Sequence, residues 1–112
     1  ILIAEDNRVS QVFLKTILNR EGCSTTIVEN GQEAIDALQK EHYDLVLMDG
    51  EMPEVDGLEA TKRIRQVFSP QSLPIIGVTA HALDVHRERF LSSGMNGYLT
   101  KPLRKEALKA EI

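Results

Sequence analysis

The sequence predicts a doubly wound α/β domain: a five-stranded parallel sheet with helices on both faces. Short apolar runs rich in β-branched residues alternate with segments of helical periodicity, and the connections between them are short. Strict alternation of this kind implies right-handed crossovers between parallel strands, which place helices on both faces of the sheet. With 112 residues the chain has the usual size of one domain, so we expect a single domain over residues 1–112.

Five segments are predicted to form the strands of this sheet. Four are short apolar runs, typical of strands buried on both faces: Ile1–Ala4, Asp44–Asp49, Leu73–Thr79 and Gly97–Thr100. The fifth, Ser24–Val28, is more polar.

The first helix is predicted over Arg8–Arg20, with Gly22 following as a stop signal. Its apolar positions recur with helical spacing and share one face: Val9, Val12, Phe13, Thr16 and Ile17. We expect this stripe to pack on the sheet.

Three more helices complete the alternation. Asn30 is the predicted cap of a second helix that carries Ala34, Ile35 and Leu38. A third helix carries Leu58, Thr61, Ile64 and Phe68 and ends before Pro70. The fourth, Leu83–Ser93, has few apolar residues and is expected to be weakly anchored, ending before Gly94.

Composition excludes several functional classes. The net charge of −4, with acidic and basic residues interspersed, provides no basic stripe for a nucleic acid. No apolar run approaches the length of a membrane span, and no signal peptide begins the chain. The lone Cys23 forms neither an internal disulfide nor a metal motif, so we expect a buried thiol and a reducing cytoplasm.

The two ends of the chain both lie inside predicted elements. Ile1 is already within an apolar run, and the last residues lie in an apparent helix that begins near Leu103. We therefore expect the chain to be a piece of a longer protein, cut within its last helix.

Reactive polar residues follow four of the predicted strands. Glu5 and Asp6 follow the first strand, Asp49 ends the third, Thr79 ends the fourth, and Lys101 follows the fifth. Any one of these residues is most often a helix cap or a solvated loop residue. The carboxyl ends of parallel strands share one edge of the sheet, where doubly wound proteins bind ligands, so together they predict a site.

Three carboxylates at one edge would repel one another unless a cation neutralised them. The Gly- and Pro-containing segment 49–57 is an irregular loop that can turn a backbone carbonyl toward that ion. Few carboxylates with several waters suit Mg²⁺, for which Mn²⁺ can substitute, better than Ca²⁺. Zinc is disfavoured because no Cys/His cluster occurs, and His42, His81 and His86 lack ligand spacing.

A carboxylate beside Mg²⁺, an ammonium group and a hydroxyl provide what phosphoryl transfer requires. In this interpretation Asp49 is the nucleophile, Glu5 and Asp6 hold the metal, and Lys101 and Thr79 contact the phosphoryl group. Phosphorylation would draw the loop after Thr79 inward and vacate space beside the sheet. Tyr98 is then either the second member of a Thr79–Tyr98 switch, rotating into that space, or an ordinary half-buried tyrosine, and these residues alone leave both interpretations open.

The chain resembles the response-regulator receiver family over essentially its whole length. The resemblance rests on the order and spacing of short motifs: Ile3-Ala4-Glu5-Asp6-Asn7, Asn30-Gly31-Gln32-Glu33-Ala34, Leu47-Met48-Asp49 with Met52-Pro53 and Asp56-Gly57, Val78-Thr79-Ala80, Gly94-Met95, and Tyr98-Leu99-Thr100-Lys101-Pro102. The residues at Glu5-Asp6-Asn7, 57–61 and 94–98 are most similar to those of receivers fused to hybrid sensor histidine kinases.

The resemblance implies a flavodoxin-like strand order, 2-1-3-4-5, and a set of site residues. It places Mg²⁺ at Glu5, Asp6, Asp49 and the backbone carbonyl of Glu51. It adds the backbone of Ala80 to the groups that contact the phosphoryl group. It also implies a cis peptide before Pro102 and roles for Glu51 and His81 in modulating dephosphorylation. Glu5 stands where the family often has aspartate, which keeps the charge and lengthens the arm.

The same resemblance implies partners and setting. The phosphodonor is a histidine kinase domain or a histidine-containing phosphotransfer protein, with no direct contact to nucleic acid or membrane. A weak homodimer through the fourth helix, fifth strand and fifth helix is also implied. The domain is not an enzyme but assists its own phosphorylation and dephosphorylation, in the cytoplasm or on the cytoplasmic side of a membrane-anchored sensor kinase.

Alternatives remain at this point. A stand-alone response regulator, or a pseudo-receiver that binds proteins without phosphorylation, shares the fold. A small Mg²⁺-dependent phosphatase with an aspartyl nucleophile is disfavoured, since haloacid dehalogenases carry a DxD motif after the first strand whereas Asp49-Gly50-Glu51 follows the third. A flavin site is disfavoured because Glu5 and Asp6 would repel a phosphate.

Overall fold

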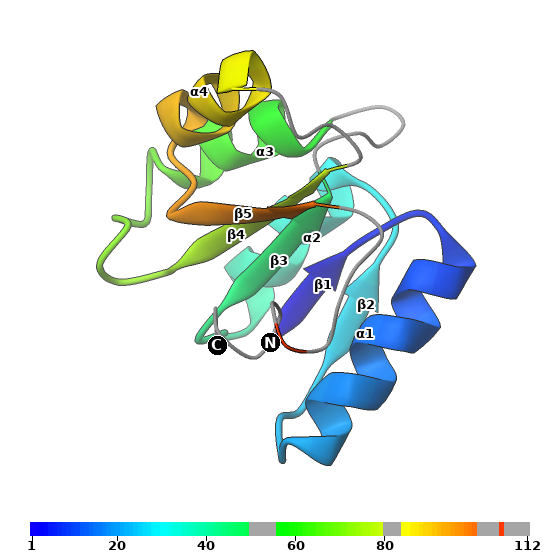
Figure 1. Cartoon of the computed structure of the whole chain (residues 1–112). Helices are drawn as coiled ribbons and strands as arrows, with labels where there is room; N and C mark the ends of the chain where they lie inside the picture. The colour runs from blue at the N-terminus through cyan, green and yellow to red at the C-terminus, as the bar shows by residue number, and fades with distance from the viewer. Residues whose placement is uncertain (50–55, 80–83, 101–105, 107–112) are drawn as a thin grey trace.

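One parallel sheet of five strands forms the centre of the protein, in the order β2-β1-β3-β4-β5 (Figure 1). The computed structural model describes residues 1–49, 56–79, 84–100 and 106. Between residues 84 and 100, side chains are described only for residues 88, 89 and 91–100. The strands are β1 (Leu2–Ala4), β2 (Thr26–Val28), β3 (Val46–Asp49), β4 (Ile75–Thr79) and β5 (Gly97–Thr100). The predicted fold class and strand order are confirmed. The first four strands begin one or two residues later than predicted, β4 only after Pro74, which has no N–H to donate.

Four helices connect the strands: α1 (Arg8–Arg20), α2 (Gly31–Lys40), α3 (Gly57–Ile64) and α4 (Asp84–Ser93). Asparagine or aspartate precedes each of the first three, and its side-chain oxygen accepts the backbone N–H three residues later. At α2 this bond joins Asn30 Oδ1 to the N–H of Glu33 at 2.8 Å, which confirms the predicted cap. Gly22, with φ of +84°, ends the turn after α1 as predicted.

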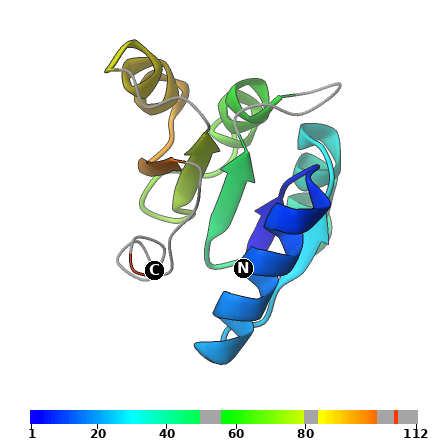
Figure 2. The ribbon, with the colours of Figure 1, turned by 45° about the vertical axis from the view of Figure 1, so that its right-hand side comes forward.

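Helices cover both faces of the sheet, with α1 on one face and α2 and α3 on the other (Figures 1 and 2). Alternate residues of the central strands point to opposite faces, so each strand contributes to two cores. The core beneath α1 contains Ile3, Leu14, Ile17, Leu18, Leu45, Leu47, Ile76 and Leu99. The core beneath α2 and α3 contains Leu2, Ala4, Ala34, Leu38, Val46, Met48, Ala60, Ile64, Leu73, Ile75 and Met95. Cys23, expected to be buried, is half-buried against the α1 core.

The prediction of which α1 face packs on the sheet was correct for Ile17 and Phe13 and wrong for Val9, Val12 and Thr16. The buried side chains of α1 are Leu14, Ile17 and Leu18, whereas Val9 is 79% exposed and Val12 is 57% exposed. The helix carries two overlapping apolar stripes with helical spacing; Ile17 belongs to both, and Phe13 lies at their border, half-buried against the same core. Periodicity identifies a stripe but does not indicate which of two stripes faces the sheet.

Helix α3 ends earlier than predicted, at Ile64, with Arg65 as its C-cap. Tighter turns follow, in which the N–H of Gln66 bonds to the carbonyl of Arg63 and the N–H of Val67 to that of Ile64. Phe68 still packs on the α2 and α3 core, so its helical spacing was informative about burial but not about the helix end. The helix predicted from Leu103 lies outside the described residues, apart from Glu106.

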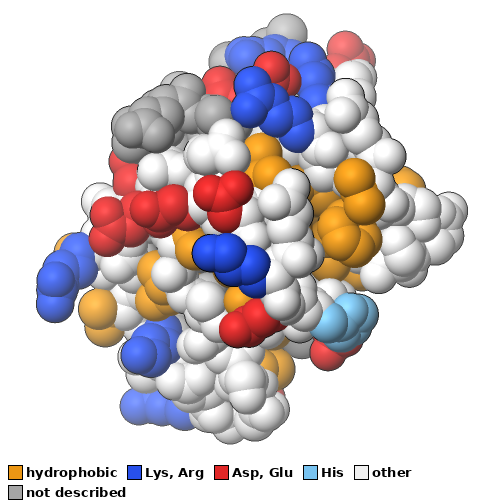
Figure 3. Space-filling model, turned by 180° about the vertical axis from the view of Figure 1, so that it is seen from behind, with side chains coloured by type: hydrophobic (Ala, Val, Ile, Leu, Met, Phe, Trp, Pro, Cys, Tyr) orange, Lys and Arg blue, Asp and Glu red, His pale blue; other side chains and the backbone are white. Residues whose placement is uncertain are grey.

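The surface seen from the side of α2 and α3 carries red and blue side chains in close alternation (Figure 3). One pair, Arg63 and Glu59 on α3, lies at 3.7 Å. Within the described ranges, no helix combines the length and apolar character needed to cross a membrane.

Candidate metal and phosphoryl site

Three carboxylates meet at the carboxyl edge of the sheet. Glu5 follows β1, Asp6 comes next, and Asp49 is the last residue of β3. Each offers an oxygen, and these oxygens all lie within 4.8 Å of one another. This group, Glu5, Asp6 and Asp49, is the acidic cluster. The structure therefore brings together the three side chains that the sequence predicted to converge.

Strand register explains why these residues meet. β1 and β3 are parallel neighbours, and Ala4 is paired with Met48. The next residue on each strand is therefore Glu5 on one and Asp49 on the other, both at the point where the pairing ends. Both side chains are buried, with exposed fractions of 1% for Glu5 and 4% for Asp49, whereas Asp6 is exposed.

Glu5 is held by hydrogen bonds on both its backbone and its side chain. Its N–H donates to the carbonyl of Val28 at 3.0 Å, which extends the pairing of β1 and β2 by one residue. Its Oε2 accepts the backbone N–H of Asn7 at 3.1 Å. Its carbonyl accepts a hydrogen bond from Nε2 of Gln11 at 2.6 Å. Sequence reasoning missed Asn7 and Gln11 as neighbours of the cluster.

Thr79 ends β4, the strand that lies next to β3. Asp49 is paired with Val78, so Thr79 lies one residue beyond Asp49 along the same edge. Its side chain is buried, and its register partner on β5 is Thr100, which is exposed. The hydroxyl of Thr79 thus belongs to the edge that holds the acidic cluster.

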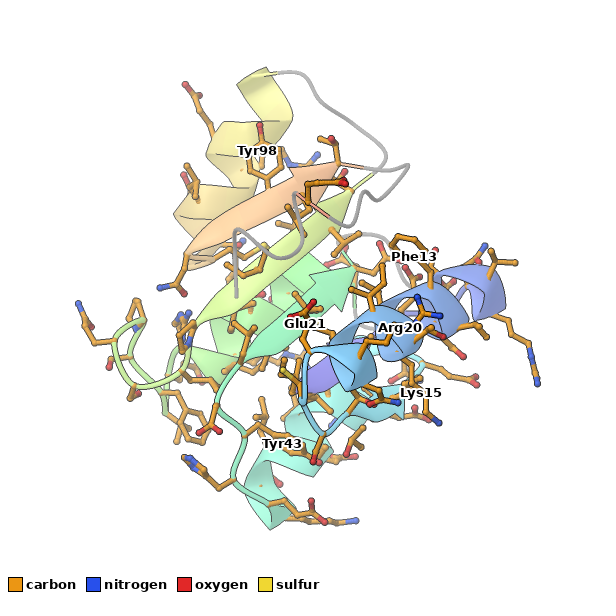
Figure 4. The ribbon with its side chains drawn as sticks, turned by 60° about the horizontal axis from the view of Figure 1, so that its bottom comes forward. Phe13, Lys15, Arg20, Glu21, Tyr43 and Tyr98 are labelled. Carbon is orange, nitrogen blue, oxygen red and sulfur yellow. The ribbon has the colours of Figure 1, made fainter. Side chains whose placement is uncertain are left out.

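Tyr98 lies on β5, paired with Gly77 of β4. It is half-buried against the core beneath α2 and α3. Figure 4 shows its ring on the side of β5 that faces α4. Tyr98 and Thr79 therefore lie on neighbouring strands, with α4 between them in the sequence.

The remaining predicted residues lie outside the described residues: Glu51, Ala80, His81, Lys101 and Pro102. His42, expected at the surface, is exposed and lies 3.2 Å from Asp44. The side chain of His86 is likewise outside the described set.

The acidic cluster fits a hard divalent cation. It supplies three carboxylates and, among its own residues, no histidine or cysteine ligand. Two of the carboxylates are buried at close range, where like charges repel more strongly than in water. A divalent cation held by these residues would replace this repulsion with attraction.

An exposed apolar face lies beside the cluster on α1. It is lined by Arg8, Val9, Val12, Phe13, Thr16, Ile17 and Arg20, and is called the α1 face below. Phe13 and Arg20 extend from the helix in Figure 4, with Lys15 on the side opposite Phe13. Asn7, the cap of α1, is the single residue between Asp6 of the acidic cluster and Arg8, where the α1 face begins.

The chain is similar to hybrid kinases and to solved receiver domains. It is 41% identical over 115 residues to hybrid signal transduction histidine kinase I of Dictyostelium discoideum, covering 96% of this chain but 7% of that protein. The chain therefore spans less than a tenth of that relative. The receiver domain of sensor histidine kinase PA1611 from Pseudomonas aeruginosa, solved with a magnesium ion in its active site cleft, superposes with a TM-score of 0.89 at 38% identity; the match covers 98% of this chain and 90% of that one.

A second solved structure holds a receiver together with a protein partner. The receiver domain of Ssk1 from Saccharomyces cerevisiae, crystallised with the histidine phosphotransfer protein Ypd1, superposes with a TM-score of 0.90 at 34% identity, covering 99% of this chain and 83% of that chain. The family model of the response regulator receiver domain matches residues 1–112. With its strand order, its acidic cluster and this match, the chain belongs to the response regulator receiver domain family.

Proposed function

We propose that this chain is the phosphoacceptor of a phosphorelay and that Asp49 accepts the phosphoryl group. The observation that carries the proposal is the convergence of Glu5, Asp6 and Asp49 within 4.8 Å at the carboxyl edge of the sheet. Two buried carboxylates beside a third support the proposal, since like charges buried together favour the binding of a cation.

The proposed reaction transfers a phosphoryl group from a phosphohistidine. A carboxylate oxygen of Asp49 attacks phosphorus as the bond between phosphorus and the imidazole nitrogen breaks. The bonding electrons return to the ring of a phosphohistidine that is protonated on its other nitrogen, so the ring leaves as neutral imidazole. Glu5, Asp6, Asp49 and the carbonyl of Glu51 would hold Mg²⁺, or Mn²⁺ in its place. When bound, this ion supplies positive charge next to the transferred oxygens.

The chain's own groups would do the rest. The hydroxyl of Thr79, the backbone N–H of Ala80 and the ammonium group of Lys101 would contact the phosphoryl oxygens, so the domain assists its own phosphorylation. Glu51 and His81 would modulate dephosphorylation, in which water attacks the phosphoryl group on Asp49.

The proposed donor is a phosphohistidine-bearing protein that docks on the α1 face. The centre of this surface is apolar, and Val9 on it is 79% exposed. It adjoins the acidic cluster, so a partner seated on it would bring a histidine close to Asp49. Arg8 and Arg20 at its two ends would favour a partner with acidic groups around an apolar centre.

The parent protein would be a hybrid sensor histidine kinase, with this domain on the cytoplasmic side. The similarity to a hybrid kinase over 96% of the chain supports this setting. The alternative parent is a stand-alone response regulator. We also propose that the domain forms a weak homodimer through α4, β5 and the following helix.

Phosphorylation by a small donor tests the assignment of Asp49. Acetyl phosphate with Mg²⁺ should add one phosphoryl group to the wild type, measured by intact-mass spectrometry, through a base-labile acyl phosphate. Asp49→Asn should gain none. Asp44→Asn is the matched control, because Asp44 is exposed and the change removes the same charge. Labelling of Asp49→Asn at the wild-type rate would refute the proposal. Turnover of simple phosphomonoesters would instead favour a phosphatase.

A further inference from the structure

Gln11 on α1 forms hydrogen bonds to the backbone of the segment that carries Glu5 and Asp6, two of the three carboxylates of the acidic cluster. Its Nε2 donates to the carbonyl of Glu5 at 2.6 Å, and its own N–H donates to the carbonyl of Asn7 at 3.0 Å. One residue thus binds the segment 5–7 at two points. Helical side chains lean toward the N-terminus of their helix, which lets Gln11 reach a residue that precedes α1.

The bond to Glu5 acts at the point where strand pairing ends. The N–H of Glu5 still bonds to Val28, but β1 ends at Ala4 and the carbonyl of Glu5 has left the ladder. That carbonyl belongs to the peptide unit that joins Glu5 to Asp6. Fixing its direction therefore restricts ψ of Glu5 and φ of Asp6, the two angles that relate this planar peptide unit to the two side chains.

The two carboxylates depend on this bond to different degrees. The Glu5 side chain is buried and accepts the N–H of Asn7, so packing and a second hydrogen bond also orient it. Asp6 is exposed, and its direction follows mainly from the backbone that carries it. Loss of the Gln11 bond should therefore loosen Asp6 more than Glu5.

We propose that Gln11 is a positioning residue that pre-orients the Glu5–Asp6 peptide for cation binding. The inference rests on the proposed function, because it assumes that the acidic cluster binds Mg²⁺. Without the amide, the cation would have to order this segment as it binds, so affinity would fall while the chemistry at Asp49 stayed intact. Gln11 would contact neither the ion nor the phosphoryl group.

The test is Gln11→Leu, which keeps the side-chain size but removes the donor. Mg²⁺ titration by calorimetry should show a dissociation constant raised about three- to tenfold, as expected for one net hydrogen bond. Labelling by acetyl phosphate should show the same increase in the Mg²⁺ concentration needed for half-maximal rate. At saturating Mg²⁺ the rate should return to within about twofold of the wild type.

A second readout needs neither metal nor activity. In the metal-free protein, Gln11→Leu should shift and broaden the amide NMR signals of Asp6 and Asn7 and leave those of β4 unchanged. Gln32→Leu is the matched control, since Gln32 is also a helical glutamine whose amide bonds to a side chain, Asp36, away from the cluster. If Gln11→Leu does not fold, as judged by circular dichroism, Gln11→Asn shortens the arm by one carbon and should give the same pattern.

Two results would overturn the role of Gln11: wild-type Mg²⁺ affinity in the variant, or an equal loss of rate at every Mg²⁺ concentration. The failure of the proposed function has a different outcome, in which the wild type and Gln32→Leu themselves bind no Mg²⁺ and accept no phosphoryl group.

Discussion

Arg65, the C-cap of α3, donates a hydrogen bond from Nε to the backbone carbonyl of Gly94 at 2.7 Å. The same guanidinium donates to the carbonyl of Leu73 and to Oδ1 of Asn96, each at 2.8 Å. One side chain thus joins the end of α3, the start of β4 and the connection from α4 to β5. Burial lowers the pKa of Arg65 from its ordinary value, although an arginine stays protonated in proteins.

Gly94→Ala should destabilise the protein more than Gly22→Ala. Both glycines have positive φ, +112° and +84°, so both alanines are strained. Only at Gly94 would the new Cβ collide, at 2.6 Å from Cγ of Arg65, whose guanidinium is held by hydrogen bonds and cannot easily move away. Urea unfolding should give a loss of roughly 1 kcal/mol for Gly22→Ala and about twice that or more for Gly94→Ala.

A double-mutant cycle isolates the contact between the two residues. In the Arg65→Ala background the excess cost of Gly94→Ala should shrink toward that of Gly22→Ala, because the colliding atom is absent. Equal costs for Gly94→Ala in both backgrounds would show that backbone strain alone accounts for the effect.

Asp49→Asn should stabilise the metal-free protein. The change removes one of three charges within 4.8 Å of one another and leaves the shape unchanged, so unfolding in EDTA should require about 1–3 kcal/mol more. Saturating Mg²⁺ should shrink or reverse this difference, since the ion stabilises the wild type more strongly. Asp44→Asn, at an exposed site, should change stability by less than about 0.5 kcal/mol in either condition. A variant less stable than the wild type in EDTA would argue against repulsion in the cluster.

Val9→Asp should slow phosphoryl transfer from a phosphohistidine protein but not from acetyl phosphate. The new charge lies on the α1 face and would have to be desolvated on docking, whereas a small donor needs no such surface. Time-course assays of phosphoryl transfer from a histidine phosphotransfer protein should show a transfer rate lowered about tenfold or more when the partner concentration is below saturation. Val67→Asp is the control, because Val67 is 78% exposed, like Val9 at 79%, but lies outside α1. Similar slowing by both variants would remove the α1 face from the docking surface.

Thr79→Val should uncouple phosphorylation from the response of β5. Valine has the shape of threonine but no hydroxyl to donate to a phosphoryl oxygen. Without that hydrogen bond the loop after Thr79 would not move inward, and Tyr98 would not rotate into the space beside it. Amide NMR with beryllofluoride, an acyl-phosphate mimic, should show large shifts from residue 84 to residue 100 in the wild type and much smaller ones in the variant. Thr100→Val, on the register partner of Thr79, should respond like the wild type. Shifts confined to the acidic cluster in the wild type would contradict the switch.

The sequence by itself determined the fold class and the position of the acidic cluster. Alternation of apolar runs with helical segments leaves a parallel sheet as the solution, and parallel strands bring residues at their carboxyl ends to one edge. Glu5 and Asp49 both follow such runs directly, so their meeting required no knowledge of side-chain packing.

Only the tertiary structure decided which side chains support that site and which face of α1 stays free. The two apolar stripes of α1 have the same period, and the choice between them depends on the angle at which the helix crosses the sheet. Gln11 and Arg65 act through hydrogen bonds to backbone carbonyls, of Glu5 and Gly94, which every residue type possesses. Such contacts cannot be predicted from the residue type of the acceptor, because every residue has a backbone carbonyl. The fold alone decides which carbonyl lies within reach of the donor.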